Sequence, residues 1–336
     1  MARFSLPLRV FLPILGMLFA QYFLYVYKPS SSPENETAQN VEEFEKELVS
    51  KFKSKYGEYR ILEDNICLEG GERCVSVRDY AVYNKEKGAY FSRHVFYEGM
   101  DLSDARLKPP KAKHKDYMDT SKWEIDKGYL TKECYTPVFR EEMHISGAVK
   151  MDRQAKANVL VIGLGAGYFN AYLHSVFPKF NVTGVDIEPE MVRIALKWYG
   201  LVLDDRQHVY TMDGVDYLKQ AASEGTKFDV IFVDACIMNL KLDVLCPVPI
   251  FLSKDVVRSM YEVLQEGGAV ISNVLSFTLS TNELLRKVMT PLREEFPFCT
   301  SRSAPLSPPN MVVSCTKRKR PEGLSKAYAA FEKELH

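Results

Sequence analysis

The sequence predicts an α/β fold in which a parallel sheet with crossover helices follows a smaller β unit. From Asn158 onward, short apolar runs alternate with segments of helical periodicity, which is typical of parallel strands joined by helices. From Tyr59 to about Arg106, short alternating stretches are separated by Asp-Asn, Gly-Gly and Lys-Gly turns, which indicates antiparallel strands. A chain of 336 residues can bury the cores of both units.

The larger unit is expected to contain five parallel strands and a closing hairpin. The parallel strands are predicted at 159–162, 182–185, 209–211, 230–233 and 269–272. Helices are predicted between and after them, at 168–177, 189–199, 214–222, 253–264 and 281–295. A helix at 136–149 leads into this unit, and two strands at 298–303 and 311–315 follow it.

An apolar segment near the amino terminus predicts a transmembrane helix. Residues 10–27 carry no charge, and Arg3 and Arg9 precede them. Eighteen helical residues nearly cross a hydrocarbon core of about 30 Å. The segment ends in Tyr22-Phe23-Leu24-Tyr25-Val26-Tyr27 and so lacks the small residues of a cleavage site. We therefore expect an uncleaved anchor, with a signal peptide and a soluble terminus as the less favoured alternatives.

The expected location is a single-pass protein of an endomembrane, and the side of the membrane stays open. Arginines before the span and glutamates after it weakly favour a lumenal body. The sequons that begin at Asn35 and Asn181 are compatible with that orientation, although the second lies at a predicted strand start.

The domain boundaries follow from these patterns. A polar, Pro/Ser-rich tether is expected at 28–40 and a short amphipathic helix at 41–55. The predicted units are a tail at 1–9, the anchor at 10–27, a linker with the short helix at 28–57, the β subdomain at 58–128, the larger domain at 129–316 and a basic, helical tail at 317–336.

Charge and cysteine content exclude some classes of partner. Lys plus Arg and Asp plus Glu both number 44, so no global field attracts nucleic acid, and none is expected as a partner. The basic runs at 108–115 and 317–320 are interpreted as solvated surface. Cys67 and Cys74 flank a Gly-Gly turn and could pair across a hairpin. The other five cysteines show no metal-ligand spacing, and we interpret them as buried and reduced, with no metal expected.

A glycine loop follows the first parallel strand. Gly163, Gly165 and Gly167 lie between an apolar run and a predicted helix, which is the context in which such a loop binds a ligand. Glycine allows the tight turn and the close approach of a bulky group. A dinucleotide site would want the third glycine one residue later, where Tyr168 stands. The spacing fits the carboxylate and ribose of S-adenosylmethionine instead.

Acidic residues end the next three strands. Asp186 is expected to accept the two ribose hydroxyls, with Ile187 beside it, or else to cap the following helix. Asp213, followed by Gly214, can accept from the adenine amino group, and Asp234 lies where the sulfonium would sit. Carboxyl ends of parallel strands meet at one edge of a sheet, so these residues predict one adenosyl site.

The residues from Val159 to Ser276 resemble the spermidine and spermine synthase superfamily. Within it the sequence is most similar to the branch represented by methyltransferase-like protein 13, which methylates elongation factor 1-alpha. The matching stretches are 161–167, 185–189, 213–217 and 246–249 through 267–268, with looser matches at 103–107 and 129–130. The resemblance implies a Rossmann-like, class I methyltransferase sheet with the small β unit over its crevice, and the hairpin at 298–315 fits such a sheet.

The departures from the synthases favour methyl transfer. Those enzymes carry two aspartates at D-x-x-D spacing after the fourth strand and an acid in the glycine loop. Here the first is Asp234, but Ile237 takes the second place and the loop has no acid. An uncompensated ammonium is costly in an apolar pocket. Aminopropyl transfer is therefore the less favoured alternative.

The predicted activity is transfer of a methyl group from S-adenosylmethionine to a nitrogen of a protein or small amine. Asp234 is the candidate catalytic residue, because a carboxylate can orient or deprotonate an amine. Cys236, Asn239 and Asp243 either line the path of the acceptor or are plain loop residues. Tyr168 and Phe169 either shield the donor or belong to the core. A catalytically silent binding protein is a third hypothesis, and a homodimer is expected by analogy with the synthases.

Overall fold

The computed structural model describes residues 33–69, 71, 73–132, 134–237, 239, 241–304 and 310–335. The apolar segment at 10–27, predicted as a membrane anchor, lies outside these residues. In the ranges just given, no helix is both long enough and apolar enough for a membrane span.

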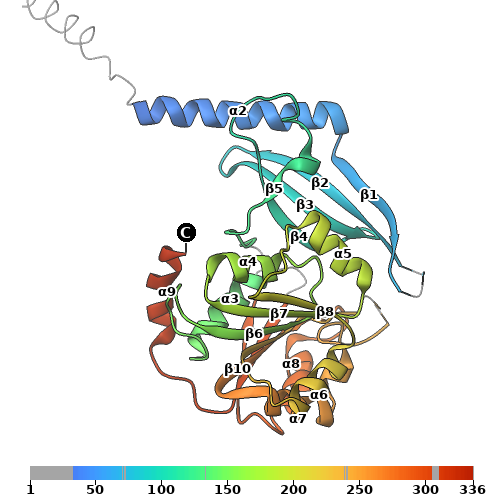
Figure 1. Ribbon diagram of the computed structural model, residues 1–336, viewed down its shortest axis with the longest axis vertical. Coiled ribbons are helices and arrows are strands. Elements are labelled where there is room, and N and C mark those ends of the chain that lie inside the picture. The colour runs from blue at the N-terminus through green and yellow to red at the C-terminus, as the bar shows by residue number, and fades with distance from the viewer. Residues whose placement is uncertain are drawn as a thin grey trace, which may run out of the picture.

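The smaller unit is an antiparallel sheet covered by a long helix. Its five strands are ordered β1 to β5 as in the sequence, and helix α2 lies across β2 and β3 (Figure 1). Leu48, Val49 and Phe52 of this helix are buried against the sheet. The bounds are α2 (Pro33–Tyr56), β1 (Tyr59–Cys67), β2 (Cys74–Asn84), β3 (Gly88–Tyr97), β4 (Met100–Lys108) and β5 (Glu124–Ile125).

The larger unit is a seven-stranded sheet ordered β11-β12-β10-β9-β6-β7-β8. Strands β6 to β10 pair in parallel, whereas β12 pairs antiparallel with both β10 and β11. The predicted strands therefore exist, and the closing hairpin lies at one edge. The bounds are β6 (Ala157–Ile162), β7 (Phe180–Asp186), β8 (Gln207–Thr211), β9 (Phe228–Val233), β10 (Leu264–Val274), β11 (Phe298–Ser303) and β12 (Met311–Thr316).

Helices cover both faces of this sheet, because its central strands are apolar on both sides. Helices α3, α4 and α9 bury their apolar stripes on one face, and α6, α7 and α8 bury theirs on the other (Figure 1). The bounds are α3 (Thr136–Ile145), α4 (Tyr168–Val176), α5 (Pro189–Trp198), α6 (Gly214–Ser223), α7 (Lys254–Val263), α8 (Thr281–Leu292) and α9 (Leu324–Glu334).

The two units share a core at the glycine loop and α5. Ala166 and Ile194 belong to the same buried cluster as the strands of the smaller sheet. Arg93 of β3 is buried, pairs with Asp79 at 2.7 Å and donates to the carbonyl of Trp198 at 2.8 Å. A buried arginine is tolerated here because each of its three side-chain nitrogens donates to an acceptor. This junction fixes the small sheet beside the carboxyl ends of the parallel strands.

Two predictions about local structure were wrong. Helix α2 begins at Pro33, so residues 33–40 are helical and do not form the expected tether. Proline suits the first turn of a helix, and glutamates near a helix amino terminus favour its dipole. Strand β4 also continues to Lys108, beyond the end near Arg106 that was expected for the small antiparallel strands.

The cysteines form more disulfides than the sequence indicated. Cys299 and Cys315 are direct partners in the register of β11 and β12, which no sequence spacing reveals. Cys134 is buried and is the free cysteine among the described residues. The interpretation of all the remaining cysteines as reduced was therefore wrong. The bonds join Cys67 to Cys74, as the Gly-Gly turn suggested, Cys236 to Cys246, and Cys299 to Cys315.

Candidate functional site

The glycine loop runs from the end of β6 to the start of α4. Gly163, Gly165 and Gly167 have φ angles of 87°, 53° and 73°, in the left-handed region that glycine adopts freely. The amide of Gly163 donates to the carbonyl of Val185 at 2.8 Å, and the amide of Asp234 donates to the carbonyl of Ile162 at 2.8 Å. The loop is therefore tied to the ends of both neighbouring strands.

Two of these glycines lie against other parts of the site. A Cβ at Gly163 would come within 2.6 Å of the backbone of Asp234 and Ala235. A Cβ at Gly165 would lie 3.3 Å from the Ser103 hydroxyl of β4, which also accepts from the amide of Ala166 at 3.3 Å. The smaller sheet thus contacts the loop directly, and the absence of side chains at Gly163 and Gly165 allows the loop to pack this closely against Asp234 and β4.

Asp186 joins the end of β7 to the glycine loop. One carboxylate oxygen accepts from the amide of Gly165 at 2.9 Å, and the other accepts from the amide of Glu188 at 2.9 Å. Burial raises the pKa of this carboxyl above its usual value, and the backbone hydrogen bonds oppose that shift. Each oxygen of a carboxylate has a second lone pair, so the group can still accept from hydroxyls of a ligand.

The next two strand ends complete one side of the crevice. Ile187 is 54% exposed, so its apolar side chain is accessible to the flat ring system of a ligand. The amide of Met212 donates to the carbonyl of Asp186 at 2.9 Å, which brings Asp213 beside it. The Asp213 side chain accepts from the amide of Val215 at 2.7 Å and caps α6. Gly214 is buried. A Cβ there would lie 2.5 Å from the side chain of Ile162, so a larger residue would not fit at this position.

Asp234 follows β9 and is held by two side chains from other elements. The Tyr135 hydroxyl donates to Oδ2 at 2.7 Å, and Asn273 Nδ2 donates to Oδ1 at 3.0 Å. Burial raises the pKa of the Asp234 carboxyl to about 7, although both hydrogen bonds lower it. A carboxyl with a pKa near neutrality can exchange a proton with an acceptor at physiological pH.

Sequence reasoning missed Tyr135 and Asn273. Tyr135 precedes α3, and Asn273 lies within the buried strand β10 at 2% exposure. Asn310 Nδ2 donates to Asn273 Oδ1 at 2.8 Å, which orients the amide toward Asp234. An asparagine inside an apolar strand is a signal that could have been used, because buried amides need partners. Nothing in the spacing of Tyr135 indicated its role.

Tyr168, Phe169 and the loop residues after Asp234 were each given two interpretations from the sequence, and the structure places them in different surroundings. Phe169 is buried in the core, whereas the Tyr168 hydroxyl donates to Thr136 at 3.2 Å close to Asp234. Asp243 forms an ion pair with Lys287 on the surface. Asn239 accepts from the amide of Lys241 at 3.1 Å, as a turn residue does.

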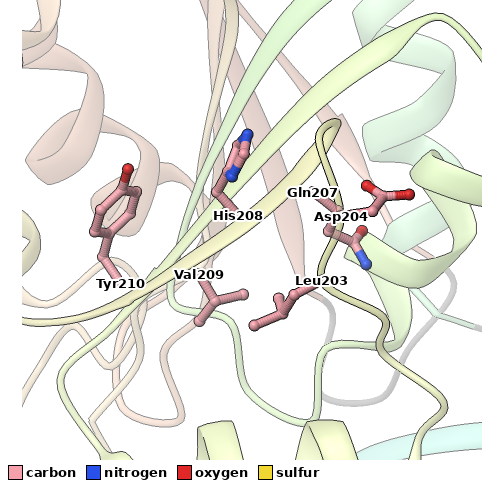
Figure 2. Close-up of a pocket in the computed structure, with 6 residues that line it drawn as sticks. All are labelled: Leu203, Asp204, Gln207, His208, Val209 and Tyr210. Carbon is pink, nitrogen blue, oxygen red and sulfur yellow. The ribbon is translucent and has the colours of Figure 1, made fainter.

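A pocket lies elsewhere, along the outer edge strand β8. Figure 2 shows its six lining residues, and none of the predicted site residues is among them. Its acid, Asp204, is 2.9 Å from His174 Nε2 and so already has a partner. The chemistry of the glycine loop and strand ends therefore identifies the crevice, and not this pocket, as the candidate site.

Comparisons with known proteins agree with that fold. Residues 153–303 match the protein family described as a methyltransferase domain. The chain is 30% identical over 180 residues to the eEF1A lysine and N-terminal methyltransferase of Xenopus laevis. This alignment covers 52% of this chain and 25% of that protein. The chain thus spans about a quarter of the length of the curated relatives it matches.

Solved structures share the architecture. Human methyltransferase-like protein 13 in complex with SAH aligns with a TM-score of 0.51 at 23% identity, covering 61% of this chain and 93% of that chain. Spermidine synthase from Thermotoga maritima aligns with a TM-score of 0.50 at 13% identity, covering 82% and 80%. These matches agree with the resemblance predicted from the sequence: residues 153–303 match a methyltransferase domain, the chain is similar in sequence to the eEF1A lysine and N-terminal methyltransferases, and it shares its fold with spermidine synthase.

Proposed function

We propose that the protein transfers a methyl group from S-adenosylmethionine to a nitrogen atom of a protein. The observation that carries this proposal is the convergence of the glycine loop, Asp186, Asp213 and Asp234 at one edge of the sheet. The activity for which these relatives are named, methylation of lysine and of an amino terminus, supports a nitrogen acceptor in a protein. A small amine remains the second acceptor class for the same site.

The residues present fit the donor. Gly163, Gly165 and Gly167 would hold its amino-acid portion against bare backbone, and Asp186 would accept from the ribose hydroxyls. Ile187 would contact the adenine ring, with Asp213 and Gly214 at its edge. When bound, S-adenosylmethionine supplies an electrophilic methyl group, so the protein needs mainly to align the acceptor.

Asp234 is the residue that would bind and deprotonate the acceptor. Its ionised carboxylate would attract and orient an amine and take its proton, while Tyr135 and Asn273 hold the carboxylate in place. An amine must lose a proton to present its lone pair, so a base with a pKa near neutrality suits this reaction.

The pH dependence of the reaction follows from that pKa. Because the ionised form of Asp234 is the base and burial raises its pKa to about 7, we expect kcat/KM to rise with pH up to about 7 and then to level off. Below that value the rate should fall about tenfold per pH unit. The measurement is kcat/KM between about pH 5.5 and pH 9 with a saturating donor. A flat profile over this range would exclude Asp234 as the titrating base.

Donor binding tests the placement of the site. Asp186→Ala removes the carboxylate that holds the Gly165 amide, and we expect its Kd for S-adenosylmethionine to rise at least about tenfold. The matched control is Asp229→Ala, because Asp229 also accepts from a backbone amide, that of Asn158 at 2.8 Å, at the opposite end of the sheet. Calorimetric titration gives both values. Equal affinity in the wild type and the Asp186 variant would refute this site.

The choice of donor distinguishes methyl transfer from aminopropyl transfer. Polyamine synthesis needs a second acid near Asp234, whereas Ile237 occupies that place and Asp243 is paired with Lys287. We therefore expect tighter binding of S-adenosylmethionine and S-adenosylhomocysteine than of the decarboxylated donor. The opposite preference would favour the aminopropyltransferase, and binding of none would favour a silent protein.

We also propose that the protein is a single-pass membrane protein of an endomembrane, anchored by residues 10–27. The apolar run and its flanks support the anchor, and the disulfides favour a lumenal body, because disulfides persist in oxidising compartments. Protease protection of the body in sealed microsomes would support this orientation, and digestion without detergent would contradict it.

A homodimer is proposed by analogy with the related synthases. Sedimentation equilibrium of residues 33–336 tests it, and a mass equal to one chain at all concentrations would refute it.

A further inference from the structure

The disulfide between Cys236 and Cys246 lies beside the candidate base. Cys236 follows Asp234 by two residues, and Asn273 Nδ2 is 3.6 Å from Cys236 Sγ as well as 3.0 Å from Asp234 Oδ1. The same buried amide therefore contacts both the carboxylate and the disulfide. A shift of Cys236 would therefore alter the position of the Asn273 amide, which orients the Asp234 carboxylate.

The disulfide also closes the base of a loop beside the acceptor side of the crevice. The amide of Ile237 donates to the carbonyl of Leu245 at 2.9 Å, and Cys246 exchanges backbone hydrogen bonds with Leu275, next to the end of β10. The amide of Val248 donates to the carbonyl of Ala235 at 2.9 Å. The covalent bond thus joins the two ends of this loop, and backbone hydrogen bonds tie these ends to the segments that follow Asp234 and β10.

The other two disulfides offer no such connection. Cys67 and Cys74 are direct partners near the tip of the β1–β2 hairpin, and Cys299 and Cys315 join the edge strand β11 to β12. In the part of the chain that the structure describes, neither pair forms a hydrogen bond with Tyr135, Asp234 or Asn273. The protein therefore contains its own controls for a general effect of disulfide loss on stability.

We propose that the Cys236–Cys246 disulfide positions Asn273 and the acceptor-side loop against Asp234, so that the oxidised protein is the active form. Reduction by a dithiol breaks the S–S bond: the reductant becomes a disulfide, and its two electrons and two protons yield two cysteine thiols. Cys246 is buried, whereas Cys236 is an exposed residue, so a dithiol would approach the bond from the side of Cys236. This inference rests on the proposed methyl transfer.

Opening this one bond should lower catalysis without lowering donor affinity. In Cys236→Ser/Cys246→Ser we expect kcat/KM for a protein acceptor to fall at least about tenfold, because small misplacements of reacting groups have large effects on rate. Recombinant eEF1A is the first acceptor to use, since the relatives act on it. The Kd for S-adenosylhomocysteine should stay within about twofold of wild type, because the glycine loop and Asp186 are untouched.

Two readouts separate positioning from a general loss of stability. Loss of the Asn273 hydrogen bond raises the pKa of Asp234, so the rising limb of the pH profile should move to higher pH in this variant. Amide hydrogen exchange at 241–245 should become faster. The variants Cys67→Ser/Cys74→Ser and Cys299→Ser/Cys315→Ser should change neither readout.

A second design avoids a variant that fails to fold. With Cys67, Cys74, Cys299 and Cys315 all changed to serine, Cys236–Cys246 is the disulfide left among those of the described residues. Dithiothreitol should then abolish most of the activity, and reoxidation should restore it. Equal activity and exchange in the oxidised and reduced protein would overturn the inference. Oxidised wild type that binds donor but methylates no acceptor would instead count against the proposed function, while hydrogen exchange would still test the positioning.

Discussion

Asp234→Asn is expected to lower kcat for methyl transfer at least about a hundredfold while the Kd for S-adenosylmethionine stays within a few-fold of wild type. Asparagine has the shape of aspartate but cannot take a proton from an amine. Its amide oxygen can still accept from Asn273, and the Tyr135 hydroxyl can accept from its amide nitrogen. Single-turnover kinetics and calorimetry of the same preparation measure the two quantities.

Tyr135→Phe is the companion variant. This change leaves the carboxylate in place but removes one hydrogen-bond donor that favours its ionised form. The pKa of Asp234 should therefore rise, and the rising limb of the pH profile should shift to higher pH. At high pH its rate should approach that of wild type. If Asp234→Asn retained the wild-type rate, the carboxylate would have no role in proton transfer and alignment of the acceptor alone would account for catalysis.

The donor side of the site was predictable because local sequence determines it. Short apolar runs mark the parallel strands, and a glycine or an acid directly after each run must lie at the carboxyl edge of the sheet. Asp186 and Asp213 were therefore predicted by position alone. Their hydrogen bonds to the Gly165 and Val215 amides were not, because a strand-end carboxylate can serve the backbone, a ligand or both.

The surroundings of Asp234, which we propose as the acceptor side, were less predictable because segments far apart in the sequence form them. Tyr135 and Asn273 reach Asp234 from the start of α3 and from β10, and only the sheet order brings them together. The Cys236–Cys246 bond likewise depends on how the loop after β9 returns to the end of β10. Pairings of this kind follow from tertiary contacts, which the periodicity of one segment does not encode.

Gly163→Ala is expected to destabilise the protein by about 2–4 kcal/mol and to weaken donor binding at least tenfold. The φ angle of 87° is strained for alanine, and the new Cβ would lie 2.6 Å from the backbone of Asp234 and Ala235. Backbone atoms cannot rotate aside, so the loop or the end of β9 must move. Either movement displaces the glycine loop or Asp234, because Gly163 lies directly between the loop and the backbone of Asp234.

Gly267→Ala is the matched control. No atom lies within 4 Å of a Cβ built at Gly267, and its φ is not in the left-handed region, so the change should alter the free energy of unfolding by less than about 1 kcal/mol. Urea denaturation and calorimetric titration of both variants test the contrast. Equal stability of the two variants would mean that the loop at Gly163 relaxes without strain. If donor affinity in Gly163→Ala were nevertheless lost, the contact between the glycine loop and the Asp234 backbone would matter for binding alone.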